Sequence, residues 1–311
     1  MIFAMSGSRA TTLVFHSGAL GDFVLTWPLA LALQKAYPDT TVTYVTHTSK
    51  GQLAARFLDT GYADADSGGW HTLYGETSDL SADSLRLLTS AESCFYFAGK
   101  NEDQFCNNLR LLVPGVPVSV LSAVPESTFI GHITAYYAHQ LFHSTIKPFY
   151  IAALKQIVEN GLPVMRGSSS RVLLHPGAGA SRKCWPLESY LQLAIQLREV
   201  GHETTMLLGE AELERYPQRV MDAVRETVTV KTPRTYVDLA EELLDAKLLI
   251  TNDNGPGHLA AVLGGTVLSL FGPSNATLWR PIGPGAHLIE SEMLGALPPA
   301  RVMTRVLELT S

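Results

Sequence analysis

Apolar and polar positions along the chain follow two periods, one typical of buried strands and the other typical of amphipathic helices. Short aliphatic runs over residues 11–17 and 41–47 flank a longer helical pattern over residues 21–38. A strand, a helix and a second strand in this order predict a βαβ unit, in which the two strands are parallel. We therefore expect the chain to begin as an α/β protein.

The alternation continues through the first half of the chain. It predicts a helix that runs into a strand over residues 84–98, a helix over 101–115, a strand over 117–123, and two helices over 132–142 and 148–161. Proline, glycine and three serines then interrupt the pattern over residues 162–171, as is typical of a connection between domains. We therefore expect an N-terminal domain over 1–167 and a C-terminal domain over 168–311.

The alternation starts again after this break. It predicts strands over 171–177 and 203–209, helices over 186–201 and 213–226, a helix and strand over 238–250, a helix, turn and strand over 258–274, and a final helix over about 300–309. Each half opens with a strand that runs into a glycine-rich turn. The pattern predicts two Rossmann-like domains whose parallel sheets face across a cleft, with ligands at the carboxyl ends of the strands.

Composition agrees with a two-domain protein and excludes some functions. The chain has 311 residues, 46% of them hydrophobic, and its formal net charge is −6, with more acidic than basic residues before residue 165. A nucleic-acid partner is not expected, because such proteins present a basic face. The apolar stretch over residues 20–34 is too short to span a bilayer and contains Asp22 and Pro28, and no signal-peptide pattern precedes it. We expect a cytoplasmic protein.

Three cysteines, Cys94, Cys106 and Cys184, lack the spacing of metal ligands. We expect reduced thiols and no metal site.

The first candidate loop, "HSGALGD" over residues 16–22, joins a predicted strand to a helix. Gly18 and Gly21 allow a substrate to approach the backbone closely, and Asp22 lies in the first helical turn. Two roles are open for Asp22. It either stabilises the helix N-terminus or acts as a general base, with His16 as the only nearby competitor.

The second candidate loop, "HPGAGASRKCWP" over residues 175–186, also follows a strand. Its small residues leave backbone N–H groups open to an anion, and Lys183 adds a positive charge. Phosphate is the anion that this combination favours. Trp185 and Pro186 fix the chain directly after the lysine, whereas His175 is expected to be a packed residue at the end of the strand.

The third candidate loop, "NDNGPGH" over residues 252–258, leads into a helix that begins near His258. Unpaired amides and the positive end of the helix dipole would favour a diphosphate. Asp253 would be repelled by phosphate, so it either accepts hydrogen bonds from sugar hydroxyls or holds the loop through backbone amides. A metal is not favoured because no partner carboxylates lie nearby in the sequence.

Taken together, the three loops resemble the ADP-heptose:lipopolysaccharide heptosyltransferases, which are inverting glycosyltransferases of family nine with the GT-B fold. The resemblance rests on "GALGDFVLTWPLALALQKAYP", "HPGAGASRKCWPLESYLQLA" and "NDNGPGHLAAVLGGTVLSLFGPS", followed by Pro281. It implies transfer of a sugar from an ADP-heptose donor to a hydroxyl of a lipopolysaccharide-core or other glycan acceptor, without cofactor or metal. Contact with the membrane would be at most peripheral, through the acceptor, and the final helix would pack on the first domain.

The resemblance also implies roles for individual residues. Asp22 matches the proposed general base, and Lys183 matches the lysine that faces the donor phosphates. Glu212, with Glu210 as a rival, would reach the ribose. The expected donor-binding residues are Gly177, Ala178, Gly179, Ser181, Lys183, Glu212, Asp253, Asn254, Gly255 and His258, and the expected acceptor-binding residues are His16, Gly18, Gly21 and Asp22.

Two features depart from the family pattern. Asn254 stands where relatives often have threonine or serine, and the first domain is acidic although a phosphorylated acceptor would favour a basic face.

Two alternatives to a glycosyltransferase place different requirements on the sequence. A nicotinamide-dependent dehydrogenase would need G-x-G-x-x-G at the first turn and an acid at the end of the next strand, and the sequence has neither. A non-catalytic sugar-nucleotide-binding protein of the same fold stays open, because Asp22 is the only strong candidate for a base.

Overall fold

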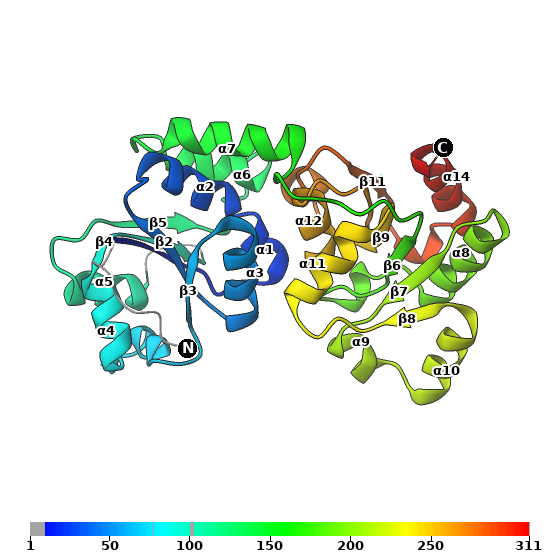
Figure 1. Cartoon of the computed structure of the whole chain (residues 1–311), viewed down its shortest axis with the longest axis horizontal. Coiled ribbons are helices and arrows are strands. Elements are labelled where there is room, and N and C mark those ends of the chain that lie inside the picture. Colours follow the sequence, from blue (N-terminus) through cyan, green and yellow to red (C-terminus); the bar gives the residue numbers. More distant parts are fainter. Residues whose placement is uncertain (1–9, 77, 100–102, 311) are drawn as a thin grey trace. The chain divides into compact units, whose positions relative to one another are not determined.

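The computed structural model describes residues 10–76, 78–99 and 103–310, and it contains two parallel sheets surrounded by helices (Figure 1). The chain divides into two compact units. The first comprises Met1–Gly18 and Thr26–Leu154, and the second comprises Ala19–Leu25 and Lys155–Ser311. The predicted α/β class is confirmed.

The first unit is built on a five-stranded sheet with the order β3-β2-β1-β4-β5, in which all neighbours are parallel. Its central strand is β1, whose side chains are all buried. The strands are β1 (Thr11–Phe15), β2 (Thr41–Thr46), β3 (Gly61–Asp64), β4 (Ala91–Ala98) and β5 (Val118–Ser122). The helices of this part are α2 (Trp27–Ala36), α3 (Thr48–Leu58), the 3-10 helix η1 (Trp70–Tyr74), α4 (Ala82–Thr89), α5 (Gln104–Leu112) and α6 (Ile133–Gln140), followed by α7 (Lys147–Asn160), which spans the division between the units.

The helix predicted over residues 21–38 is two helices, α1 (Leu20–Val24) and α2. Pro28 lies in the first turn of α2, where its missing N–H costs nothing, whereas inside a continuous helix it would remove a hydrogen bond and clash with the preceding turn. The break also separates the two helices between the units, because α1 packs with the second unit and α2 with the first.

The second unit is built on a six-stranded parallel sheet with the order β11-β10-β9-β6-β7-β8. Its strands are β6 (Val172–His175), β7 (Thr204–Leu207), β8 (Thr229–Lys231), β9 (Leu248–Asn252), β10 (Val267–Phe271) and β11 (Ala286–Glu290). Its helices, besides α1, are the 3-10 helix η2 (Ser181–Lys183), α8 (Leu187–Glu199), α9 (Glu210–Arg215), α10 (Gln218–Thr227), α11 (Tyr236–Asp245), α12 (Gly255–Val262), α13 (Ala276–Trp279), the 3-10 helix η3 (Leu294–Ala296) and α14 (Pro299–Thr310). Along the chain, β6 is the first strand of this sheet, and it begins at Val172. Residue 168 therefore remains our proposed start of the second domain.

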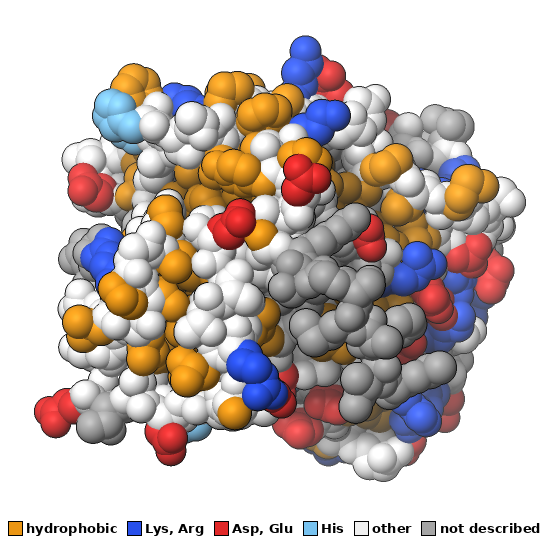
Figure 2. Space-filling view, turned by 60° about the vertical axis from the view of Figure 1, so that its left-hand side comes forward, with side chains coloured by type: hydrophobic (Ala, Val, Ile, Leu, Met, Phe, Trp, Pro, Cys, Tyr) orange, Lys and Arg blue, Asp and Glu red, His pale blue; other side chains and the backbone are white. Residues whose placement is uncertain are grey.

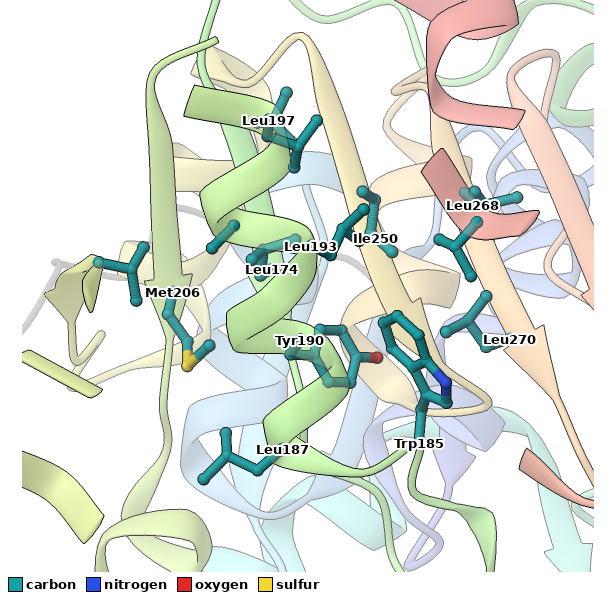
Figure 3. Close-up of a cluster of buried hydrophobic side chains, with 14 of the residues drawn as sticks. Leu174, Trp185, Leu187, Tyr190, Leu193, Leu197, Met206, Ile250, Leu268 and Leu270 are labelled. Atoms are coloured by element: carbon teal, nitrogen blue, oxygen red, sulfur yellow. The ribbon is translucent and has the colours of Figure 1, made fainter. Parts of the chain in front are cut away.

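The core of the second unit lies between α8 and one face of the sheet (Figure 3). Tyr190, Leu193 and Leu197 follow helical spacing on α8 and are wholly buried, as are Leu174 of β6 and Ile250 of β9. This packing fixes α8 and the loop that leads into it.

The structure places α14 in the second unit, and packing of this helix on the first domain stays a prediction. Val302 and Val306, one helical turn apart, are fully buried in the core that α8 covers. The apolar face of α14 is therefore used within the second unit.

In both sheets the chain reverses its direction of winding beside the first strand of the sheet, and loops diverge at such a switch point to leave space for a ligand. In the first sheet the switch lies between β1 and β4, and in the second it lies between β6 and β9. The segments that follow β1, β6 and β9 include the three loops singled out in the sequence.

Candidate functional site

The switch point of the second sheet brings the second and third candidate loops together. His175, the last residue of β6, is in register with Thr251 of β9, so the two loops begin at the same edge of the sheet. Lys183 and Asp253 meet there, with Lys183 Nζ 2.8 Å from Asp253 Oδ2.

The ion pair between Lys183 and Asp253 was not anticipated by either role left open for the acid. The side chain of Asp253 is 8% exposed and that of Lys183 is 31% exposed. The carboxylate is therefore the more deeply buried partner and lies beneath the ammonium group, while part of the lysine faces solvent. Such an ammonium can accept an anionic ligand without a large rearrangement.

Asn254 serves both as a helix cap and as a clamp on the second loop. Its Oδ1 accepts a hydrogen bond from the N–H of Gly257, which makes it the N-cap of α12. Its Nδ2 lies 2.6 Å from the carbonyl oxygen of Gly177 and 2.7 Å from Oγ1 of Thr251. Asparagine can fill both roles because it carries an acceptor and a donor.

The cap changes the expectation for amides at the third loop. Pro256 has no N–H, and the N–H of Gly257 is used by Asn254. Among the first three residues of α12, this leaves the N–H of Gly255. An anion could therefore interact with this amide and with the positive end of the helix dipole.

Gly177 and Glu212 are packed closely together. Glu212 is 6% exposed, and its Oε2 accepts a hydrogen bond from the N–H of Gly209, while the rival Glu210 is exposed. A Cβ at Gly177 would lie 2.1 Å from Oε1 of Glu212. A Cβ at this position would therefore have to displace the Glu212 carboxylate. Of the other residues expected in this loop, Ala178 is half-buried, and Gly179 and Ser181 are exposed.

His175 lies beside Glu212 and is buried. Burial lowers the pKa of His175 below its usual value, and the nearby charge of Glu212 acts in the opposite direction without overcoming it. Nδ1 of the ring lies 3.2 Å from Nδ2 of Asn254. This agrees with a packed residue at the end of the strand and not with a proton donor.

The close packing at Gly177 leads to a prediction. Gly177→Ala is expected to displace the Glu212 carboxylate and to lower the free energy of unfolding by about 1–3 kcal/mol, because the added methyl group overpacks the loop. Gly179→Ala is the matched control, since a Cβ there would meet nothing within 4 Å and the backbone N–H is kept. Urea unfolding of both variants checks this, and equal stability of the two would contradict the packing argument.

The helix that carries Asp22 packs against α12 within the second unit. A Cβ at Gly21 would lie 3.0 Å from Cδ2 of His258, and a Cβ at Gly255 would lie 2.7 Å from Cβ of Leu20. Two glycines thus let α1 approach the N-terminus of α12. Asp22 is half-buried in the first turn of α1, and the cap position is Ala19, so Asp22 is not the N-cap residue.

The residues expected at the acceptor are divided between the two units. Gly21 and Asp22 belong to the second unit, whereas His16 and Gly18 belong to the first. His16 is 4% exposed and packs its ring edge-on against Phe97. Burial, and secondarily the charge of Lys50, lower the pKa of His16 to about 3, so the ring is neutral near pH 7.

Sequence reasoning missed two buried polar residues beside these loops. Lys50, which is 7% exposed at the start of α3, donates a hydrogen bond to the carbonyl oxygen of Gly18 over 2.6 Å. Asn252, the last residue of β9, is wholly buried beside the second loop. A polar residue at the end of an aliphatic strand was the available signal for Asn252, whereas nothing in the sequence marked Lys50.

Within the part of the chain that the structure describes, no group of three or more histidines, cysteines or acids is placed to hold a metal ion. The second sheet instead offers an ammonium group, a helix N-terminus and a tightly packed glycine loop at its switch point. These features are typical of one class of protein, the α/β proteins that bind a phosphate-bearing ligand above a parallel sheet.

Comparison with known proteins identifies the family within this class. Residues 148–307 match glycosyltransferase family 9 (heptosyltransferase), and the chain belongs to this family. The chain is 31% identical over 120 residues to lipopolysaccharide heptosyltransferase 2 of Escherichia coli (strain K12), an alignment that covers 37% of this chain and 34% of that protein. The match thus spans about a third of the relative's length.

Solved structures show the fold over nearly the whole chain. A glycosyltransferase family 9 protein from Veillonella parvula superposes with a TM-score of 0.71 at 17% identity, covering 99% of both chains. Escherichia coli heptosyltransferase WaaC with ADP superposes with a TM-score of 0.70 at 16% identity, covering 96% of this chain and 99% of that chain. The predicted GT-B fold is confirmed.

Proposed function

We propose that this protein is an inverting glycosyltransferase that moves heptose from ADP-heptose to a hydroxyl of a lipopolysaccharide-core or other glycan acceptor. The observation that carries the proposal is the ion pair of Lys183 with Asp253, directly before the N-cap of α12 at the switch point of the second sheet, in a chain of the heptosyltransferase family.

The donor diphosphate would bind above this switch point. Lys183 would supply a positive charge, and Gly255 would supply an amide at the positive end of the α12 dipole. Both would stabilise negative charge that develops on the diphosphate as the sugar leaves, without a metal. Glu212 is our candidate for the ribose contact because it is buried next to Gly177, and the exposed Glu210 is less suited.

The ion pair with Asp253 would reduce the positive charge of this site before the donor binds. While Asp253 contacts Lys183, the pair is close to neutral, and an arriving diphosphate would share the ammonium group with the carboxylate. Asp253 would then remain beneath Lys183 as a positioning group. Its second oxygen would be available to a sugar hydroxyl, which keeps one of the two roles expected from the sequence.

Asp22 is the proposed general base that removes the acceptor proton. Its helix packs against α12, where Gly21 contacts His258, so the base would be held by the same helix whose N-terminus faces the leaving group. Inversion needs the base and the leaving group on opposite sides of the sugar carbon, and a fixed position for each lowers the entropic cost of the reaction.

Acceptor binding is assigned to the loop after β1, with His16, Gly18 and Gly21.

No helix in the described part of the chain is long and apolar enough to cross a membrane. Phe142, Phe149 and Ile151 are exposed just before and within the start of α7. Figure 2 shows one face of the protein, on which hydrophobic side chains lie among charged ones. We propose that the protein works in the cytoplasm and meets the membrane only peripherally, through its acceptor.

A thermal-shift screen of ADP-, UDP-, GDP- and dTDP-sugars tests the donor assignment. A ligand that binds only the native state raises its stability by RT ln(1 + [L]/Kd), so a donor at 100 times its Kd adds about 2.7 kcal/mol. We expect the largest rise in melting temperature with an ADP-sugar. A larger rise with another nucleotide sugar would change the proposed donor, and no rise with any of them would remove the donor site.

A further inference from the structure

One buried side chain joins the two ends of the loop that carries Lys183. Nδ2 of Asn252 donates to the carbonyl oxygens of Pro176 at 2.8 Å and Gly177 at 3.4 Å, where the loop begins. Oδ1 of the same side chain accepts a hydrogen bond from the N–H of Trp185 at 2.9 Å, where the loop ends. The amide of Asn252 thus closes the base of the loop over residues 176–185.

The acceptor side of this amide is itself anchored in the core. Tyr190 of α8 donates its hydroxyl to Oδ1 of Asn252 over 3.2 Å, and Tyr190 is wholly buried. Its ring packs edge-on against Trp185 with the centroids 4.9 Å apart, and Figure 3 shows the hydroxyl directed toward the side of the indole. The indole N–H of Trp185 donates to the carbonyl oxygen of Leu297. The side chains of Tyr190 and Trp185 are therefore held by contacts outside the loop.

We propose that Asn252 is a positioning residue for the donor diphosphate, acting through the loop that carries Lys183. The inference rests on the proposed function for its catalytic consequence. Its physical basis is that a wholly buried amide with partners on both sides has one favourable orientation. A loop closed in this way presents Lys183 and the amides of Ala178 and Gly179 to a ligand in a fixed arrangement, which lowers the cost of ordering them on binding.

The substitution Asn252→Asp removes the hydrogen bonds that Asn252 donates and keeps those that it accepts. A carboxylate still accepts hydrogen bonds from Trp185 and Tyr190, but it cannot donate to Pro176 and Gly177 and repels their carbonyl oxygens. We expect the core side to stay packed and the start of the loop to be released.

Asn108→Asp is a matched control in the first unit. Asn108 is 8% exposed and its Nδ2 donates to the carbonyl oxygens of Leu73 at 2.9 Å and Gly75 at 2.8 Å. The same two donated bonds are lost there, so the control reports what the substitution costs away from the Lys183 loop.

Limited digestion with trypsin tests the inference without any ligand, because Arg182 and Lys183 are cleavage sites within the loop. We expect Asn252→Asp to speed cleavage at these two positions by about tenfold or more, since loss of two hydrogen bonds opens the loop locally. Asn108→Asp should leave that rate unchanged. Unchanged cleavage at both positions in Asn252→Asp, or equal acceleration by Asn108→Asp, would overturn the proposal.

Binding of ADP and AMP gives a second readout. Asn252→Asp should weaken ADP binding more than AMP binding, and this difference should disappear when Lys183→Ala is also present, as expected for residues that act as one unit. Equal loss for both nucleotides would assign Asn252 a general structural role and overturn the inference. If the unmodified protein binds neither nucleotide, the proposed donor site fails, while the digestion still decides whether Asn252 holds the loop.

Discussion

Replacing Asp22 with asparagine is expected to slow sugar transfer by about 10²- to 10⁴-fold, because the amide cannot accept the acceptor proton. The side-chain shape is kept, so donor affinity and melting temperature should change little. Single-turnover transfer, donor affinity and melting temperature measure the three effects separately.

The alternative role of Asp22, stabilisation of the helix N-terminus, predicts a loss of stability in Asp22→Ala and no loss of transfer rate in Asp22→Asn. If Asp22 only stabilises α1, the variant Asp22→Asn should transfer sugar at a near-normal rate, and Asp22→Ala should lower the free energy of unfolding by about 0.3–1 kcal/mol. The N-cap of α1 is Ala19, so a loss of the larger size typical of N-cap residues is not expected. A near-normal transfer rate in Asp22→Asn would exclude Asp22 as the base.

The second large effect is expected at Lys183. Lys183→Ala removes the ammonium group that would face the donor diphosphate and leaves the buried carboxylate of Asp253 without its ion-pair partner. Loss of a charge-assisted hydrogen bond corresponds to about 1.5–3 kcal/mol, or roughly 10- to 150-fold in donor affinity. We expect donor binding to weaken by this amount and transfer to slow with it.

Two further variants control for this change. Arg182→Ala removes a neighbouring exposed cation from the same 3-10 helix and should leave donor affinity nearly unchanged. Lys183→Ala should also lower the free energy of unfolding, because the buried carboxylate of Asp253 loses its partner. The double variant Lys183→Ala with Asp253→Asn removes both charges and should recover this stability but not donor affinity. Donor affinity in Lys183→Ala equal to that of the unmodified protein would show that Lys183 does not face the phosphates.

The strands of the sheets could be predicted because they are short aliphatic runs between glycine, proline and polar residues. The runs over residues 41–47 and 117–123 correspond to β2 and β5. The prediction of one helix over residues 21–38 failed because the helical spacing of apolar residues continues across a break in the backbone. The helical pattern runs through Leu25 and Thr26, although the backbone ends one helix there and a second helix begins at Trp27, with Pro28 in its first turn. Periodicity reports which side chains are apolar but not where the helix axis changes direction.

Long-range partners could not be predicted from local pattern. The amphipathic spacing of residues 300–309 indicated a helix with one apolar face, but only the packing of Val302 and Val306 shows which core receives that face. In the candidate site, the pairing of Lys183 with Asp253 joins positions 70 residues apart. A sequence without related sequences beside it contains no signal for such a pairing.

The loops of the candidate site were predicted better than the function of their members. Glycine-rich segments after strands mark places where the backbone is exposed at the edge of a sheet, so the loops after β6 and β9 could be located. The one signal for Asn252 was its place at the end of an aliphatic strand, and that place alone does not distinguish a buried asparagine from one in a turn. Its four hydrogen bonds come from positions that only the fold brings together.

The most direct measurement of the central claim is the release of ADP from ADP-heptose, with and without a heptose-deficient lipopolysaccharide core as acceptor. The proposed activity predicts that the acceptor accelerates ADP release, that one glycoside forms for each ADP released, and that the anomeric configuration of the transferred sugar is opposite to that in the donor. Tight binding of ADP-heptose with ADP release that no glycan acceptor accelerates would contradict it, and would identify a sugar-nucleotide-binding protein without transferase activity.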